Sequence, residues 1–196
     1  MPAKNIVKKY FENQYYHVYN RGVNKDLIFR ENSDKDFLLK LFNQRLSKPT
    51  NINKTRILLN PLGKSEILSF CLLDNHYHLL FWLNNDTKSI TKFMHSIFTS
   101  YTMYFNLKYD RVGPLFQSRY KASIINNDPY LIHISRYIHL NPSDYENYKY
   151  SSYQSYLGEN TYPWLKISKI LDLFKNSDYE EFVKLGIKDQ DLFKFE

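Results

Sequence analysis

The sequence predicts an α+β protein in which helices pack on a mostly antiparallel sheet. Two apolar runs of strand length are joined by a tight Asp74-Asn75 turn, and other segments carry apolar residues at helical spacing. Both kinds of segment alternate along the chain, which is typical of a layered α+β domain. With 196 residues, the chain is within the range of one ordinary domain and can bury a sizeable core.

The first elements expected are a strand and a helix. Residues 15–22, YYHVYNRG, are rich in β-forming residues and end at a glycine. A helix is expected over residues 33–46, with Ser33 as its cap. Residues 47–65 mix Pro, Asn and Gly with a short apolar run, so we expect a loop that could contain a minor strand. The core-facing residues of the helix are expected to be Phe37, Leu38, Leu41 and Leu46.

A central strand pair and a long helix follow. The strands are expected over residues 66–74, EILSFCLLD, and 76–83, HYHLLFWL, because Asp and Asn tolerate the turn geometry of a tight hairpin. Residues 87–108 form an amphipathic pattern whose aromatic stripe we interpret as core packing. The apolar positions of that pattern are Ile90, Phe93, Met94, Ile97, Phe98, Tyr101 and Tyr104.

The last strand is expected over residues 117–125, after a Gly-Pro turn. A third helix should begin at Asp128, as its cap, with proline at the first helical position, and end near Asn141 because proline follows. One or two short helices are expected over residues 164–185 as a C-terminal helical tail. The order of elements resembles the ferredoxin-like sandwich, and we expect the helices on one side of the sheet.

Composition limits the function classes. Lys and Arg outnumber Asp and Glu by 27 to 20, and 17% of the residues are aromatic, which fits a nucleic-acid-binding protein but is also compatible with coding bias. The surplus of basic residues lies in residues 1–162. The single cysteine, Cys71, excludes a disulfide within the chain. No run approaches the roughly 18 apolar residues of a membrane helix, so we expect a cytoplasmic protein.

Two pairs of residues could carry chemistry. His76 and His78 alternate with Tyr77 on one strand, so their imidazoles should project from one face about 7 Å apart, a spacing that suits two ligands of one metal ion. They could equally be polar residues at a strand end. Tyr137 and Asn141 are four residues apart, which places them on one helical face. A tyrosine there could also be an ordinary amphipathic anchor.

Several segments taken together resemble a known family. YHVYNRGVNKDLIF, DNHYHLLFWL, GPLFQSRYKASI, YLIHISRYIHLNP and YSSYQSYLG follow one another in the order found in the REP-associated tyrosine transposases. These proteins are members of the HUH single-tyrosine (IS200-like) transposase superfamily. The resemblance runs from about Tyr15 to Gly158. It implies a catalytic domain over residues 1–162, followed by a C-terminal helical extension of unknown role over residues 163–196.

The resemblance also implies a site and a reaction. His76 and His78 match the family's metal-binding motif, Asn141 its third ligand, and Tyr137 its nucleophile. The family uses Mg²⁺ or Mn²⁺ and cleaves and rejoins single-stranded DNA next to a hairpin through a 5′-phosphotyrosine. Its members act as a monomer or a homodimer. From the residues alone, two imidazoles and one amide would also admit zinc or nickel.

Contacts with DNA are expected from basic and aromatic residues near the site. These are Arg21, Arg111, Arg119, Lys121 and Tyr120, together with Tyr19 and Phe116. They could also be solvated charges beside core aromatics. Two other functions are also compatible with the sequence. One is a catalytically silent or domesticated protein that binds hairpin or single-stranded DNA, and the other is an unrelated metal hydrolase that uses His76 and His78.

Overall fold

The computed structural model describes residues 9–46, 60–174 and 178–186. The minor strand considered between residues 47 and 65 falls mostly on residues outside these ranges. In the described part of the chain, no helix is both long enough and apolar enough to cross a membrane.

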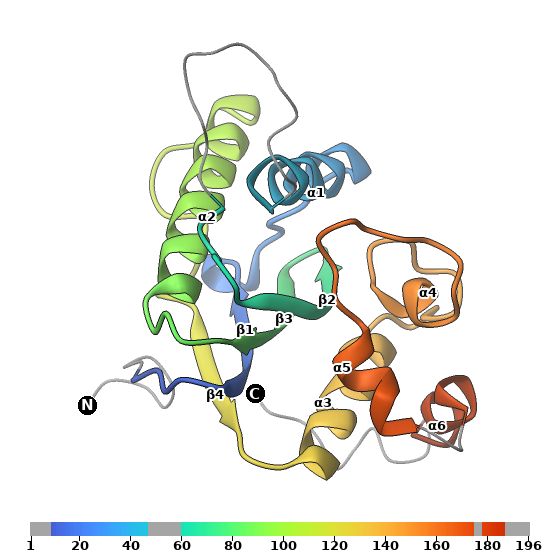
Figure 1. Ribbon diagram of the computed structural model, residues 1–196. Helices are drawn as coiled ribbons and strands as arrows, with labels where there is room; N and C mark the ends of the chain where they lie inside the picture. The colour runs from blue at the N-terminus through green and yellow to red at the C-terminus, as the bar shows by residue number, and fades with distance from the viewer. Residues whose placement is uncertain (1–8, 47–59, 175–177, 187–196) are drawn as a thin grey trace.

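A four-stranded sheet forms the centre of the protein (Figure 1). The strands are β1 (Gln14–Arg21), β2 (Glu66–Leu73), β3 (His76–Leu83) and β4 (Lys121–Ile125), in the spatial order β2-β3-β1-β4. Every neighbouring pair is antiparallel. This is the ferredoxin-like order, so the predicted fold class is confirmed. Because β1 and β3 are the inner strands, their side chains are held by a neighbour on each side.

Helices cover both faces of the sheet, so the expectation of helices on one side was wrong. One face packs against α1 (Asn32–Leu46) and α2 (Ser89–Lys108), and the other against α3 (Asp128–Leu140). The physical reason lies in β3, where Tyr77 is buried with the α1 and α2 residues and Leu80 is buried with α3. A strand that is apolar on both faces requires cover on both.

The C-terminal segment packs on α3. It contains α4 (Tyr153–Tyr156), α5 (Ser168–Leu171), a 3-10 turn, η2 (Asp172–Phe174), and α6 (Tyr179–Leu185). Ile170 of α5 and Val183 of α6 are buried in the same cluster as Ile138 of α3. The short tail helices were predicted. Helix α4 was not, because its polar and tyrosine-rich sequence lacks a helical apolar pattern.

Several element ends differ from expectation. The cap of α3 is Asn127, whose side chain accepts a hydrogen bond from the backbone N–H of Tyr130 at 2.8 Å, so Asp128 is the first helical residue. Ser33 lies inside α1 rather than at its cap. The predicted strand over residues 117–125 is paired only from Lys121 onward. A short 3-10 turn, η1 (Val23–Lys25), follows β1.

One buried carboxylate connects α1 to α2. Asp34 accepts hydrogen bonds from Lys108 Nζ at 2.7 Å, Tyr109 OH at 2.8 Å and Tyr104 OH at 3.1 Å. Its side chain is completely buried, and Lys108 also contacts the exposed Glu31. Burial alone would raise the pKa of Asp34, but the hydrogen bonds from Lys108 and Tyr109 outweigh it and hold the pKa below its ordinary value.

Candidate active site

The two histidines of β3 project from the face of the sheet that α3 covers. In the antiparallel register, His78 lies opposite Tyr19 and His76 lies opposite Arg21 of β1. Cross-strand partners share a face of the sheet, so these four side chains lie together. Tyr137 of α3 joins them around a cavity of about 360 Å³, which Lys121 of β4 also lines.

His76 and Asn141 meet although 65 residues separate them. His76 Nε2 lies 3.1 Å from Asn141 Oδ1, and Asn75 Oδ1 accepts a hydrogen bond from His76 Nδ1 at 2.6 Å. Burial lowers the pKa of His76, so the neutral imidazole is favoured and its second nitrogen keeps a lone pair. Two electron pairs, from the imidazole and from the amide oxygen, therefore face each other.

His78 is oriented by a third histidine, His17 of β1. The two rings are stacked, and His17 Nε2 lies 2.9 Å from His78 Nδ1. His78 Nε2 is buried and has no hydrogen-bond partner within the described structure. Burial lowers the pKa of His17 to about 3, and burial with the neighbouring His17, His76 and Arg21 holds the pKa of His78 well below its ordinary value. Both rings are therefore neutral.

Tyr137 stands over the histidine pair. Its ring is edge-on to His78 with the centroids 5.4 Å apart, and edge-on to His17 at 6.0 Å. Burial raises the pKa of the Tyr137 phenol, and a side-chain hydrogen bond from Asn141 opposes that rise. Asn141 thus reaches the phenol through its amide N–H group and His76 through its amide oxygen, so it connects the two halves of the site.

The donor set fits one divalent cation. Neighbouring ligands of an octahedral ion at about 2.1 Å lie roughly 3 Å apart, close to the 3.1 Å between His76 Nε2 and Asn141 Oδ1. The unpartnered Nε2 of His78 is the kind of buried polar atom that a ligand would satisfy. Among the described residues, no group of three or more His, Cys, Asp or Glu side chains could hold an ion, so Asn141 is needed to complete the set.

The structure brings together some of the predicted DNA-binding residues and not others. Arg21 and Lys121 line the cavity with the histidines. Arg111 instead donates hydrogen bonds to Asn106 Oδ1 and to the Pro114 carbonyl, and Tyr120 lines a different cavity on the α2 side of the sheet. Arg119 is exposed.

His17 is a residue of the site that sequence reasoning missed. His17 lies on β1, a strand that the sequence does predict. Its contact with His78 depends on how β1 is aligned with β3, and the sequence pattern does not determine that alignment. A histidine among the apolar residues of an inner strand was the available signal, since a buried imidazole needs a partner.

Comparison with known proteins shows a sequence family and a structural similarity. A sequence model of the family described as "Transposase IS200 like" matches residues 10–141. A solved structure described as "Structure of the REP associates tyrosine transposase bound to a REP hairpin" is similar to this chain with a TM-score of 0.54 and 13% sequence identity, covering 86% of this chain and 93% of that chain. At that identity, the similarity concerns the fold. A search of curated proteins found no match.

Proposed function

The chain belongs to the IS200-like transposase family, and from that premise we propose that it cleaves and rejoins single-stranded DNA through a 5′-phosphotyrosine on Tyr137. The observation that carries the proposal is the convergence of Tyr137 and the two histidines of β3 around one cavity, with Asn141 Oδ1 3.1 Å from His76 Nε2. In this arrangement one copy of the chain would supply every residue of the proposed site. A homodimer is compatible with the same chemistry.

The reaction is a transesterification. The Tyr137 oxygen attacks the phosphorus of a DNA phosphodiester, the new phosphorus–oxygen bond forms, and the bond to the 3′ oxygen breaks. The phenol proton is lost to solvent or a bound base, and the departing 3′ oxygen takes up a proton. Because the phosphorus remains esterified, the reverse reaction rejoins a strand without a nucleotide cofactor.

A divalent cation, Mg²⁺ or Mn²⁺, would be held by His76 Nε2, His78 Nε2 and Asn141 Oδ1. When bound, it would neutralise charge on the phosphate and make the nearby phenol more acidic. The protein's own residues prepare this site in two ways. His17 orients His78, and Asn141 holds the phenol beside the ligand set. Arg21 and Lys121 line the same cavity and would hold the phosphates of the strand.

We infer a hairpin-bearing substrate and a REP-associated role. The structurally similar transposase is described as bound to a REP hairpin, and the motifs of this chain follow the order found in the REP-associated group. We assign catalysis to residues 1–162. Residues 163–196 would support it indirectly, because α5 and α6 pack against α3, the helix that carries Tyr137.

The proposal is tested with the DNA that flanks the gene. A single strand from that region, carrying any inverted repeat that folds as a hairpin, is incubated with the protein and Mg²⁺ or Mn²⁺. We expect a covalent protein–DNA adduct that survives denaturation and does not form when EDTA is present. A catalytically silent binding protein would retain the strand without forming the adduct.

A further inference from the structure

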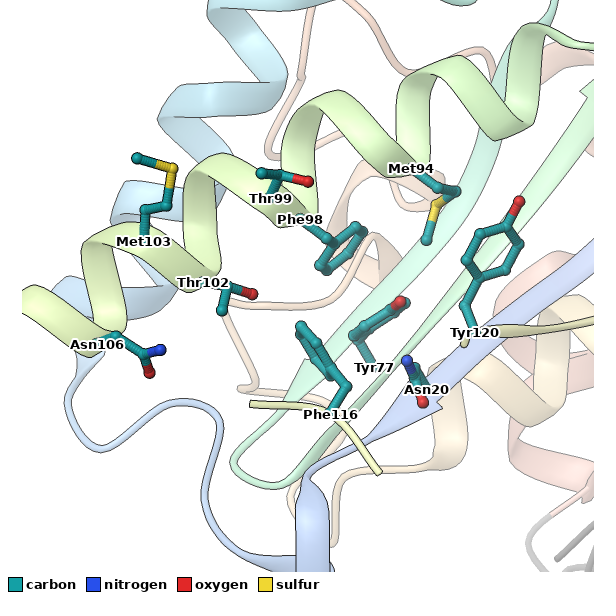
Figure 2. Close-up of a pocket in the computed structure, with 10 residues that line it drawn as sticks. All are labelled: Asn20, Tyr77, Met94, Phe98, Thr99, Thr102, Met103, Asn106, Phe116 and Tyr120. Carbon is teal, nitrogen blue, oxygen red and sulfur yellow. The ribbon is translucent and has the colours of Figure 1, made fainter. Parts of the chain in front are cut away.

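A second cavity lies on the α2 side of the sheet, opposite the candidate active site (Figure 2). Its volume is about 370 Å³. Asn20 and Tyr77 reach it from the strands, Phe98 and Thr102 from α2, and Phe116 from the segment that leads into β4. None of the described residues that line this cavity is acidic. The nucleotide chemistry proposed above does not use it.

One stretch of chain forms the wall between the two cavities. Phe116 and Tyr120 line the second cavity, whereas Gln117 and Lys121 line the candidate active site. In each of these two adjacent pairs, one side chain lines the second cavity and the other lines the candidate active site. Asn20 lines both cavities. A DNA strand held in the candidate active site therefore has the second cavity on the other side of this wall.

Hydrogen bonds fix the wall to β1. The backbone N–H of Gln117 donates to the Arg21 carbonyl at 3.0 Å, and Asn20 Nδ2 donates to the Ser118 carbonyl at 3.0 Å. These bonds hold the two cavities at a fixed distance from each other. A fixed distance is needed if the two cavities are to bind two parts of one ligand.

Aromatic rings give the second cavity its chemistry. The half-buried Phe116 ring lies nearly perpendicular to Tyr77 and Phe98, with centroids 5.9 Å and 5.6 Å away. Thr99 and Thr102 add hydroxyl groups from α2. Flat apolar walls with a few polar groups suit a planar ring that has a polar edge. A nucleobase is such a ring, and it must be unpaired, since duplex bases are enclosed by stacking and pairing.

The charges near the wall favour a nucleic acid over an apolar peptide. Arg119 is exposed on the wall itself, and Lys121 follows it in the candidate active site. Basic side chains near an aromatic cavity suit a chain that carries a phosphate between its bases. A peptide side chain could fill the aromatic part but would leave these cations without a role.

We infer that the second cavity binds one unpaired base of the same DNA strand whose phosphate enters the candidate active site. This inference rests on the proposed action on single-stranded DNA and extends it. By holding a base at a fixed spacing from Tyr137, the cavity would set the position of cleavage along the strand.

The methionines provide a direct test. The chain has three, and two of them, Met94 and Met103, line the cavity. The full-length protein is labelled on its methionine methyl groups and titrated at low ionic strength with a short oligothymidine strand, and separately with an abasic strand of the same length. Binding of each strand is followed independently by fluorescence anisotropy. We expect oligothymidine to shift both methyl resonances and the abasic strand to leave them in place.

Thr102→Trp provides the matched variant, because it fills the cavity from the helix side. It should abolish the methyl shifts and weaken oligothymidine binding about 10-fold, which is the usual contribution of one stacked base. The control is Leu107→Trp, whose native side chain is 87% exposed and does not line the cavity. If circular dichroism shows that Thr102→Trp does not fold, Thr99→Trp replaces it.

Two results would overturn the inference and are distinguishable. If oligothymidine binds while the methyl resonances stay in place, or if the abasic strand shifts them equally, the cavity does not hold a base, although the proposed function stands. If oligothymidine does not bind at all, both proposals fail: that the second cavity binds a base and that the protein acts on single-stranded DNA.

Discussion

His76 Nε2 and Asn141 Oδ1 lie 3.1 Å apart across 65 residues of sequence. The first is on an inner strand and the second follows the last turn of α3, so this contact joins the sheet to the helix that carries Tyr137. Because both atoms bring an electron pair, a cation bound between them would stabilise the contact. The Asn141 side chain would therefore link the proposed metal ligands to the proposed nucleophile.

Replacement of Asn141 tests that link. Asn141→Leu removes the amide oxygen, and we expect Mn²⁺ affinity to fall about 10-fold, measured as free Mn²⁺ by electron paramagnetic resonance. Asn141→Asp keeps an oxygen donor at the same place and should retain the affinity. Equal loss in both variants would mean that the amide oxygen is not a ligand.

His17 is predicted to hold His78 in the orientation that binds metal. His17→Leu leaves the Nδ1–H of His78 buried without an acceptor, and we expect Mn²⁺ affinity to fall by about 10- to 100-fold. His17→Gln keeps an acceptor of similar reach and should restore part of the affinity. A folded Leu variant with unchanged affinity would show that His17 has no such role.

Buried neutral histidines make stability depend on pH. Burial lowers the pKa values of His17 and His139 from 6.5 to about 3. As pH falls below 6.5, the unfolded chain takes up protons that the folded protein does not, so stability is lost between pH 6.5 and 3. Each such histidine contributes about 1.4 kcal/mol per pH unit. His139→Gln should reduce the slope of unfolding free energy against pH by that amount, whereas the exposed His95→Gln should not.

Asp34 is predicted to be a determinant of stability rather than of catalysis. Asp34→Asn weakens the charge-assisted hydrogen bonds from Lys108 and Tyr109, and we expect the free energy of unfolding to fall by about 2 kcal/mol in urea titrations at pH 7. Because the pKa of Asp34 is lowered in the folded protein, its contribution is present above the unfolded pKa and is lost as pH falls through the folded value. Glu31→Gln, which changes the exposed partner of Lys108, should leave stability unchanged. Comparable loss in the two variants would contradict the role given to Asp34.

Much of the fold could be predicted from sequence, because hydrophobic periodicity and turn residues carry the relevant information. The alternation in HYHLLFWL identified β3 and put both histidines on one face, as the structure finds. The helix carrying Tyr137 was predicted with its C-terminal end near Asn141. These features depend on neighbours in sequence, where local rules apply.

The remainder depends on tertiary structure. Three features follow from contacts between segments that are distant in sequence. Helices cover both faces of the sheet, and His17 lies beside His78. Residues 150–152 form backbone hydrogen bonds with β2. The second cavity has the same origin, because its walls come from β1, β3, α2 and the segment before β4. Single-sequence patterns do not encode such register.

Peptide mapping of the covalent adduct would identify the residue that bonds to DNA, which we propose is Tyr137. Tyr19 lines the same cavity and provides the matched control. After incubation of the protein with hairpin-bearing single-stranded DNA and Mn²⁺, protease and nuclease digestion should leave a phosphonucleotide on the peptide that contains Tyr137. The Tyr137→Phe protein should give no adduct and Tyr19→Phe should still give one. A phosphonucleotide on any other residue, or an adduct that persists in Tyr137→Phe, would show that Tyr137 is not the nucleophile.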